Sequence, residues 1–152
     1  MSDILTRALF NSLISGTGGI AVHSYGIYPT AAAGTTLTGG AADTYGVWAQ
    51  IIAAASVTAD IWITHIEINT GNTATNYIVQ IGTGASASET GRIALPYMRQ
   101  AVTAAGNVPS VLIPLPFPLR VPASTRIAGR VQDTAGSSTI VVHVVYCTGL
   151  LA

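Results

Sequence analysis

The feature that most constrains the fold is a series of short segments in which apolar and polar residues alternate, in a chain with almost no charge. Residues 119–134 and 139–146 alternate in this way, and the polar stretch 135–138 separates them. This pattern predicts two β-strands joined as a hairpin. Only 8% of the residues are charged and lysine is absent, whereas about a quarter are charged in a typical soluble domain. A surface built from small uncharged residues favours packing against other chains.

The strongest single strand is predicted over residues 60–69. Both of its faces are partly apolar, which is typical of a strand in the middle of a sheet or at an interface. Strict alternation places Trp62, Ile66 and Ile68 on one face and Ile61, Ile63, His65 and Glu67 on the other.

Residues 111–117 form an unusual strand-like segment, because proline occupies every second position from 114 to 118. Proline cannot donate a hydrogen bond to a neighbouring strand, so the segment is expected at a sheet edge or at a corner between sheets. Alternation predicts that four apolar side chains of the segment point inward: Val111, Ile113, Leu115 and Phe117.

About eight or nine short strands separated by polar turns, without alternating helices, predict an all-β fold. The expected architecture is an antiparallel β-sandwich of jelly-roll type spanning residues 20–152. The remaining strand-like segments are 21–28, 47–54, 77–82 and 92–95, with a weak strand inside the loop 30–44.

Residues 2–15 differ from the rest because their apolar residues recur at the helical spacing of three and four. Ser2 suits the start of a helix and Gly16 its end, and the glycine-rich stretch 16–19 reads as a hinge. Residues 1–19 are therefore interpreted as an N-terminal arm, helical or extended, that either folds back onto its own domain or anchors the chain to another subunit. The candidate anchor residues are Ile4, Leu5, Leu9 and Leu13.

The sequence offers no constellation for catalysis. The histidines at 23, 65 and 143 are dispersed, and Cys147 is the only cysteine, so neither a cysteine-based metal site nor an intrachain disulfide is expected. Cys147 is expected to be a small buried residue near a strand end. We therefore expect no catalytic residue, no cofactor and no metal; a small hydrolase is the weakest of the alternatives.

Charge and hydropathy also exclude two classes of partner. The formal net charge is zero and no basic stripe is present, so a nucleic-acid partner is not expected. No apolar run reaches the length of a membrane-spanning helix, and the N-terminus lacks the pattern of a secretion signal. The chain is thus expected to be made in the cytoplasm and to have no membrane partner.

Three further side chains are candidates for partner binding. Arg126 and Arg130 lie four residues apart on one strand face, and Arg120 could extend them into a short basic row. They could instead form salt bridges within or between subunits, with Asp133 or Glu89 as carboxylates. Trp62 could contact a partner. Trp48, Trp62 and the tyrosines could also bind a sugar, although tryptophans within strands more often belong to the core or to an interface.

Three segments of the chain resemble small jelly-roll structural proteins of tailed bacteriophages. The resemblance covers about residues 45–146 and rests on Val-Thr-Ala-Asp-Ile-Trp-Ile at 57–63, Ile-Val-Gln-Ile-Gly-Thr-Gly-Ala-Ser-Ala-Ser-Glu at 78–89, and Pro-Phe-Pro-Leu-Arg-Val-Pro-Ala-Ser-Thr-Arg-Ile-Ala-Gly-Arg at 116–130. Ser124 stands where the pattern has glycine. The motifs carry no catalytic residue.

The resemblance implies a component of the virion. The expected function is that of a capsid decoration, or cement, protein: a homotrimer on the capsid surface that clamps neighbouring copies of the major capsid protein. The alternative is a tail-fibre, head-fibre or baseplate module that binds a host surface glycan.

Overall fold

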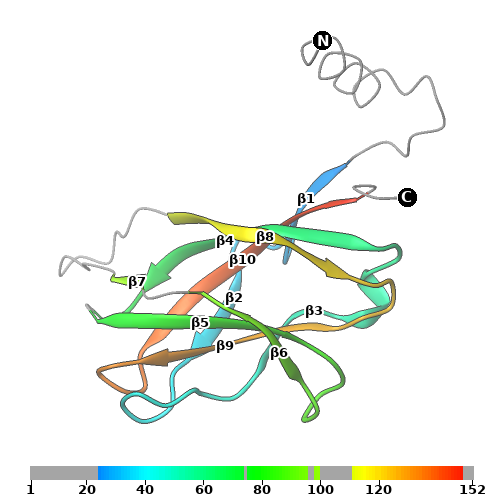
Figure 1. The fold of residues 1–152 in the computed structure, drawn as a ribbon. Helices are drawn as coiled ribbons and strands as arrows, with labels where there is room; N and C mark the ends of the chain where they lie inside the picture. Colours follow the sequence, from blue (N-terminus) through cyan, green and yellow to red (C-terminus); the bar gives the residue numbers. More distant parts are fainter. Residues whose placement is uncertain (1–23, 74, 96–97, 100–110, 149–152) are drawn as a thin grey trace, which may run out of the picture.

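Two antiparallel sheets packed face to face make up the domain (Figure 1). The computed structural model describes residues 24–73, 75–95, 98–99 and 111–148. Because the two sheets are antiparallel and pack face to face, the predicted all-β antiparallel sandwich is confirmed. The predicted arm, with Ile4, Leu5, Leu9 and Leu13, lies outside the described residues.

The first sheet has the order β1-β10-β4-β8, and β2 pairs with β10 beyond the end of β1. The predicted central position of the strand over residues 60–69 is confirmed, because β4 lies between β10 and β8. The strands of this sheet are β1 (Tyr25–Tyr28), β2 (Thr35–Thr38), β4 (Ile61–Gly71), β8 (Val111–Val121) and β10 (Thr139–Thr148).

The second sheet has the order β3-β9-β5-β6, and the short strand β7 also pairs with β5. A single turn of 3-10 helix, η1 (Ala54–Ser56), connects β3 to the first sheet. The strands of this sheet are β3 (Ala49–Ile52), β5 (Asn76–Thr83), β6 (Thr90–Ala94), β7 (Met98–Arg99) and β9 (Ile127–Asp133).

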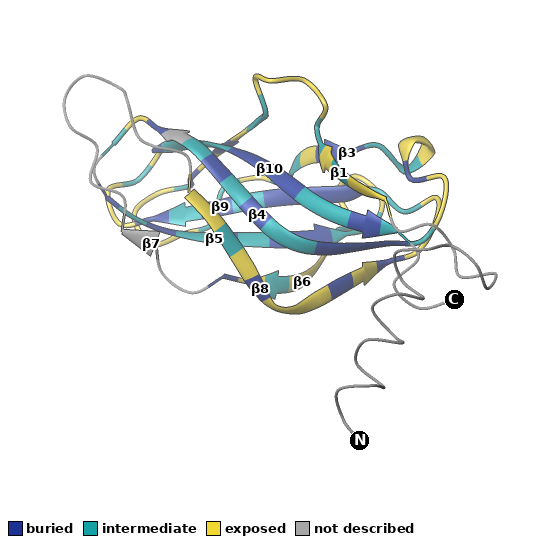
Figure 2. Cartoon of the chain, turned by 90° about the horizontal axis from the view of Figure 1, so that it is seen from above, coloured by how far each residue is buried: buried dark blue, intermediate teal, exposed yellow. Residues whose placement is uncertain are grey.

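Aliphatic side chains from both sheets fill the space between them, and Figure 2 shows this buried layer in dark blue. The predicted alternation of β5 is confirmed: Tyr77, Val79 and Ile81 are buried in the core, while Ile78 and Gln80 are only partly buried. Each fully buried aliphatic side chain contributes about 1.5–3 kcal/mol to folding. The interior is thus apolar and is built from residues that the strand period selects.

The predicted division of β4 into two faces is wrong. Ile61, Ile63, Ile66 and Ile68 all belong to the core. The ladder with β10 shifts register at Thr64, because His65 and Ile63 pair with the consecutive residues Val145 and Tyr146. One extra residue reverses the alternation of everything that follows it.

The predicted hairpin of the last two strands is also wrong. β9 and β10 lie in different sheets, so residues 134–138 cross from one layer to the other. Buried Asp133 holds this crossing: its carboxylate accepts hydrogen bonds from the backbone N–H of Gly136 (2.5 Å) and from the backbone N–H (3.3 Å) and hydroxyl (2.9 Å) of Ser138. Gly39 lies so close that a Cβ there would be 1.9 Å from Asp133 Oδ2.

β8 is an edge strand, as its prolines predict. The expected inward orientation holds for buried Leu115 and for Ile113, which packs against the core, but is wrong for Val111 and Phe117, which are 39% and 60% exposed. In the ladder with β4, Ile63 pairs with Leu119 and His65 with Pro114. Residues 115–118 therefore lie opposite the single residue Thr64, and this bulge turns Phe117 toward solvent.

The turn before β9 contains Ser124, which stands where the resembled pattern has glycine. Ser124 has a φ of 58°, in the left-handed region that favours glycine. Its backbone N–H donates to the carbonyl of Val57 at 2.7 Å. The glycine of the pattern fits this backbone conformation without the steric cost that serine carries there.

Candidate functional site

A stack of aromatic and guanidinium groups lies on the outer face of the second sheet. The guanidinium carbon of Arg130 is 4.4 Å from the ring centroid of Tyr45 and 4.4 Å from that of Trp48. Arg130 Nε donates a 2.6 Å hydrogen bond to Gln80 Oε1 on the neighbouring strand β5. Stacking and this bond hold the guanidinium in one orientation.

Glycine at position 82 makes room for the indole. A Cβ on Gly82 would be 2.6 Å from Cη2 of Trp48, closer than packed carbon atoms allow. Gly82 pairs with Ala128 on β9, so the residues beneath the indole are small. The backbone of β5 thus fixes the height at which Trp48 lies above the sheet.

A nearly buried ion pair adjoins the stack. Arg126 Nη1 lies 2.5 Å from Glu89 Oε1, and the two side chains are 13% and 3% exposed. Arg126 Nε also donates to Gln50 Oε1 at 3.1 Å. Glu89 follows the loop 84–88, in which Ala87 has a left-handed φ of 64°, so the ion pair ties that loop to the strand β9.

Acid should destabilise the domain through two carboxylates. Burial raises the pKa of Glu89, but hydrogen bonds from its own backbone and from Arg126 outweigh burial and lower the pKa overall. The backbone N–H of Ala123 and the guanidinium of Arg120 lower the pKa of Asp60. Because both values lie below those of the unfolded chain, about 4, the stabilisation is present above that pH and is lost as pH falls through the folded values.

Thermal unfolding across a pH series checks this prediction. We expect the melting temperature to fall steeply below about pH 4.5. The double variant Asp60→Asn, Glu89→Gln should melt lower at pH 7 and show a shallower decline. Parallel curves for the two proteins would contradict the assignment.

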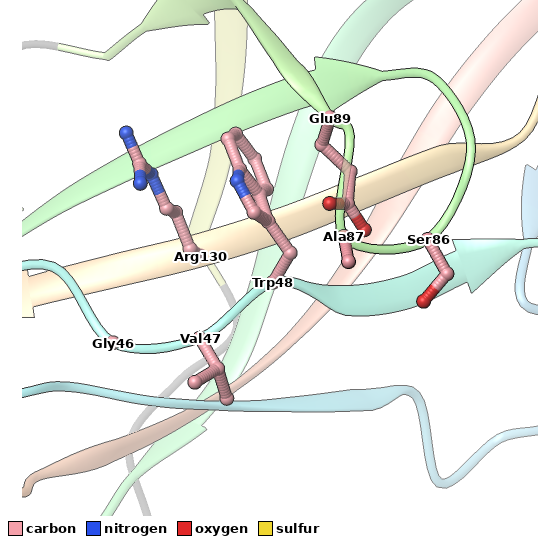
Figure 3. Close-up of a pocket in the computed structure, with 7 residues that line it drawn as sticks. All are labelled: Gly46, Val47, Trp48, Ser86, Ala87, Glu89 and Arg130. Carbon is pink, nitrogen blue, oxygen red and sulfur yellow. The ribbon is translucent and has the colours of Figure 1, made fainter.

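An open pocket of about 390 Å³ lies beside the stack. Figure 3 shows the indole of Trp48 between the side chains of Arg130 and Glu89. Val47 adds an apolar surface that is 82% exposed. The residues that line the pocket are Gly46, Val47, Trp48, Ser86, Ala87, Glu89 and Arg130.

The structure separates the other predicted partner-binding residues from this pocket. Trp62 lies on β4 in the other sheet and is only 6% exposed, so little of its surface is open to a partner. Arg130 lies on β9 and Arg126 immediately precedes this strand, but Arg120 is on β8 and pairs with Asp60 at 2.6 Å. The predicted basic row of three arginines is therefore wrong, because its members lie on two sheets.

The described histidines and the cysteine have structural surroundings. His143 is buried; its Nε2–H donates to the carbonyl of Ala31 at 3.1 Å and its Nδ1 lies 3.0 Å from Asn69 Nδ2. Cys147 is fully buried near the end of β10, as predicted, and burial raises the pKa of its thiol. Among the described residues, no three histidine, cysteine or acidic side chains gather as a metal site would require.

Sequence reasoning named Arg126, Arg130 and, as a possible sugar contact, Trp48, but it did not bring these residues together at one site. Tyr45 and Trp48 lie just before β3, and Gln80 carries no chemical signal by itself. Within the described ranges, no helix is long and apolar enough to span a membrane. Comparison with family models and with curated proteins gives no match for this chain.

Proposed function

We propose that this chain is a non-enzymatic structural protein of a virus particle, a decoration protein on the capsid surface. It is made in the host cytoplasm, forms a homotrimer and binds the major capsid protein. It acts through mass action, because a protein that binds the assembled shell and not the separated subunits stabilises the shell.

The strand order supports the finer description of the fold as a jelly roll. With β2 taken as the first strand, the two sheets have the orders 2-10-4-8 and 3-9-5-6. We propose a jelly roll on this basis, because an eight-stranded jelly roll is likewise built from two antiparallel sheets. A fold alone does not give a function, so the functional proposal depends on the properties of the protein surface.

The observation that carries the proposal is the number of exposed apolar residues on the edge strand β8. Leu112 and Phe117 are 54% and 60% exposed, and Val111 is also exposed. The prolines of β8 lack the N–H groups that another strand would need, so this edge offers side-chain contact rather than an extension of the sheet. Together with a net charge of zero, such a surface is suited to burial against another protein chain.

Sedimentation of the purified chain with particles tests the proposal. We expect the chain to sediment with assembled shells, to remain in solution with separated coat subunits, and to raise the temperature at which shells disassemble. Equal binding to shells and separated subunits, or no binding to either, would contradict a decoration role.

Light scattering on the free protein completes this test. We expect a trimer whose stability changes little with salt, because few charges are available to be screened. Its interfaces should bury about 2,000 Å² or more in total. A monomer at micromolar concentration would contradict the trimer.

A further inference from the structure

We infer that the pocket beside Arg130 binds a saccharide that carries a carboxylate. This goes beyond the decoration function, because it concerns a small-molecule site on the outer face of the second sheet and not the attachment to a shell. The inference rests on the charge and orientation of the Arg130 side chain and on the residues that form the pocket walls.

Arg130 is a cation without a carboxylate partner. The ion pairs in the described part of the chain are Arg120 with Asp60 and Arg126 with Glu89. Arg130 is half-buried, and its Nε donates to a neutral amide oxygen of Gln80. Because Arg126 neutralises Glu89, the charge that remains at the pocket is the positive charge of Arg130.

The stack determines how an anion can approach. The ring centroids of Tyr45 and Trp48 both lie 4.4 Å from the guanidinium carbon, so the rings cover part of the group and leave its edge as the approach for a ligand. That edge holds the two Nη atoms, and a carboxylate is the group that can accept two parallel hydrogen bonds from such a fork. The fixed orientation of Arg130 reduces the entropy lost on binding.

The remaining walls indicate a sugar rather than a bare anion. The pocket volume of about 390 Å³ lies in the range of small-molecule sites. Exposed Val47 and the indole edge of Trp48 offer an apolar surface for C–H groups. Ser86 and the backbone of Gly46 and Ala87 offer polar groups for hydroxyls. A ring with hydroxyls, an apolar side and one carboxylate matches all three features.

Two tryptophans in the chain make the test specific, since each gives one indole N–H signal in a nitrogen-15 correlation spectrum. Trp48 lines the pocket and Trp62 is buried in the opposite sheet. A Trp62→Phe variant assigns the two signals. Titration with D-glucuronate should shift the Trp48 signal in a saturable way and leave the Trp62 signal in place.

Matched ligands and variants complete the experiment. Glucose has the same ring without the carboxylate and should bind at least about tenfold more weakly, as should acetate, which lacks the ring. Arg130→Gln should reduce glucuronate affinity at least about tenfold, whereas Arg92→Gln, on exposed β6, should leave it unchanged. Melting curves show whether each variant folds. If Arg130→Gln does not fold, the titrations of the wild-type protein with the three ligands still test the inference. An unmoved Trp48 signal, or equal binding of glucuronate, glucose and acetate, would overturn the inference.

Discussion

Replacing Asp133 by alanine is expected to lower the free energy of unfolding by about 3–5 kcal/mol. The carboxylate is 1% exposed and is the acceptor for both Gly136 and Ser138 in the crossing between the sheets. Without it, the buried N–H and hydroxyl of Ser138 lose their partner. For a domain of this size the melting temperature should fall by roughly 10–20 °C.

Two further variants separate the hydrogen bonds from the loss of volume. Asp133→Asn keeps the shape and one acceptor oxygen, so its loss should be smaller than that of the alanine variant. Glu67→Ala removes a carboxylate from the half-buried outer face of β4 and should change the free energy of unfolding by less than about 1 kcal/mol. Denaturant titration measures all three. Equal effects of Asp133→Ala and Glu67→Ala would refute the role given to Asp133.

Deleting residues 2–19 should abolish attachment to particles while the β domain stays folded. The core of the sandwich is built from residues between Leu37 and Val144, so the melting temperature should be nearly unchanged. The apolar stripe of the arm is too short to form a stable helix alone and therefore has to dock on something, and we propose that it docks on a partner.

Point variants of the arm sharpen this prediction. Each buried leucine contributes about 1.5–3 kcal/mol, so replacing Leu5 and Leu9 by aspartate should weaken particle binding at least about a hundredfold. Aspartate at Thr6 and Asn11, which lie off the stripe, adds the same charge and should have little effect. A truncated chain that unfolds, or one that binds particles with unchanged affinity, would show that the arm is not an anchor.

The sequence predicted fold class and most strand positions because strand period and turn composition are local properties. It could not show that Thr64 inserts an extra residue into β4, which moves Ile66 and Ile68 to the same side as Ile63. Nor could it show the partner of β10. A short polar connection is compatible both with a hairpin and with a crossing between sheets, and Asp133 decides between them through buried contacts.

The candidate site was predictable only in part. The spacing of Arg126 and Arg130 on one strand gives their common face, and Glu89 was among the carboxylates expected to pair with them. Their surroundings depend on residues from β3, β5 and the loop before β6, which only the pairing of strands brings together. The aromatic stack is therefore a property of the tertiary fold.

The pairing of β1 and β2 with β10 has a consequence for how the protein acquires its structure. The earliest described strands find their only sheet neighbour in the strand that is synthesised last among those described. β3 likewise pairs with β9, so this pairing can form only after β9 has been synthesised. Contacts between segments this far apart in the sequence give a high contact order. Bringing the segments together costs loop-closure entropy before any contact forms, so we expect folding in the millisecond-to-second range. Both sheets are therefore completed only once β9 and β10 have been synthesised.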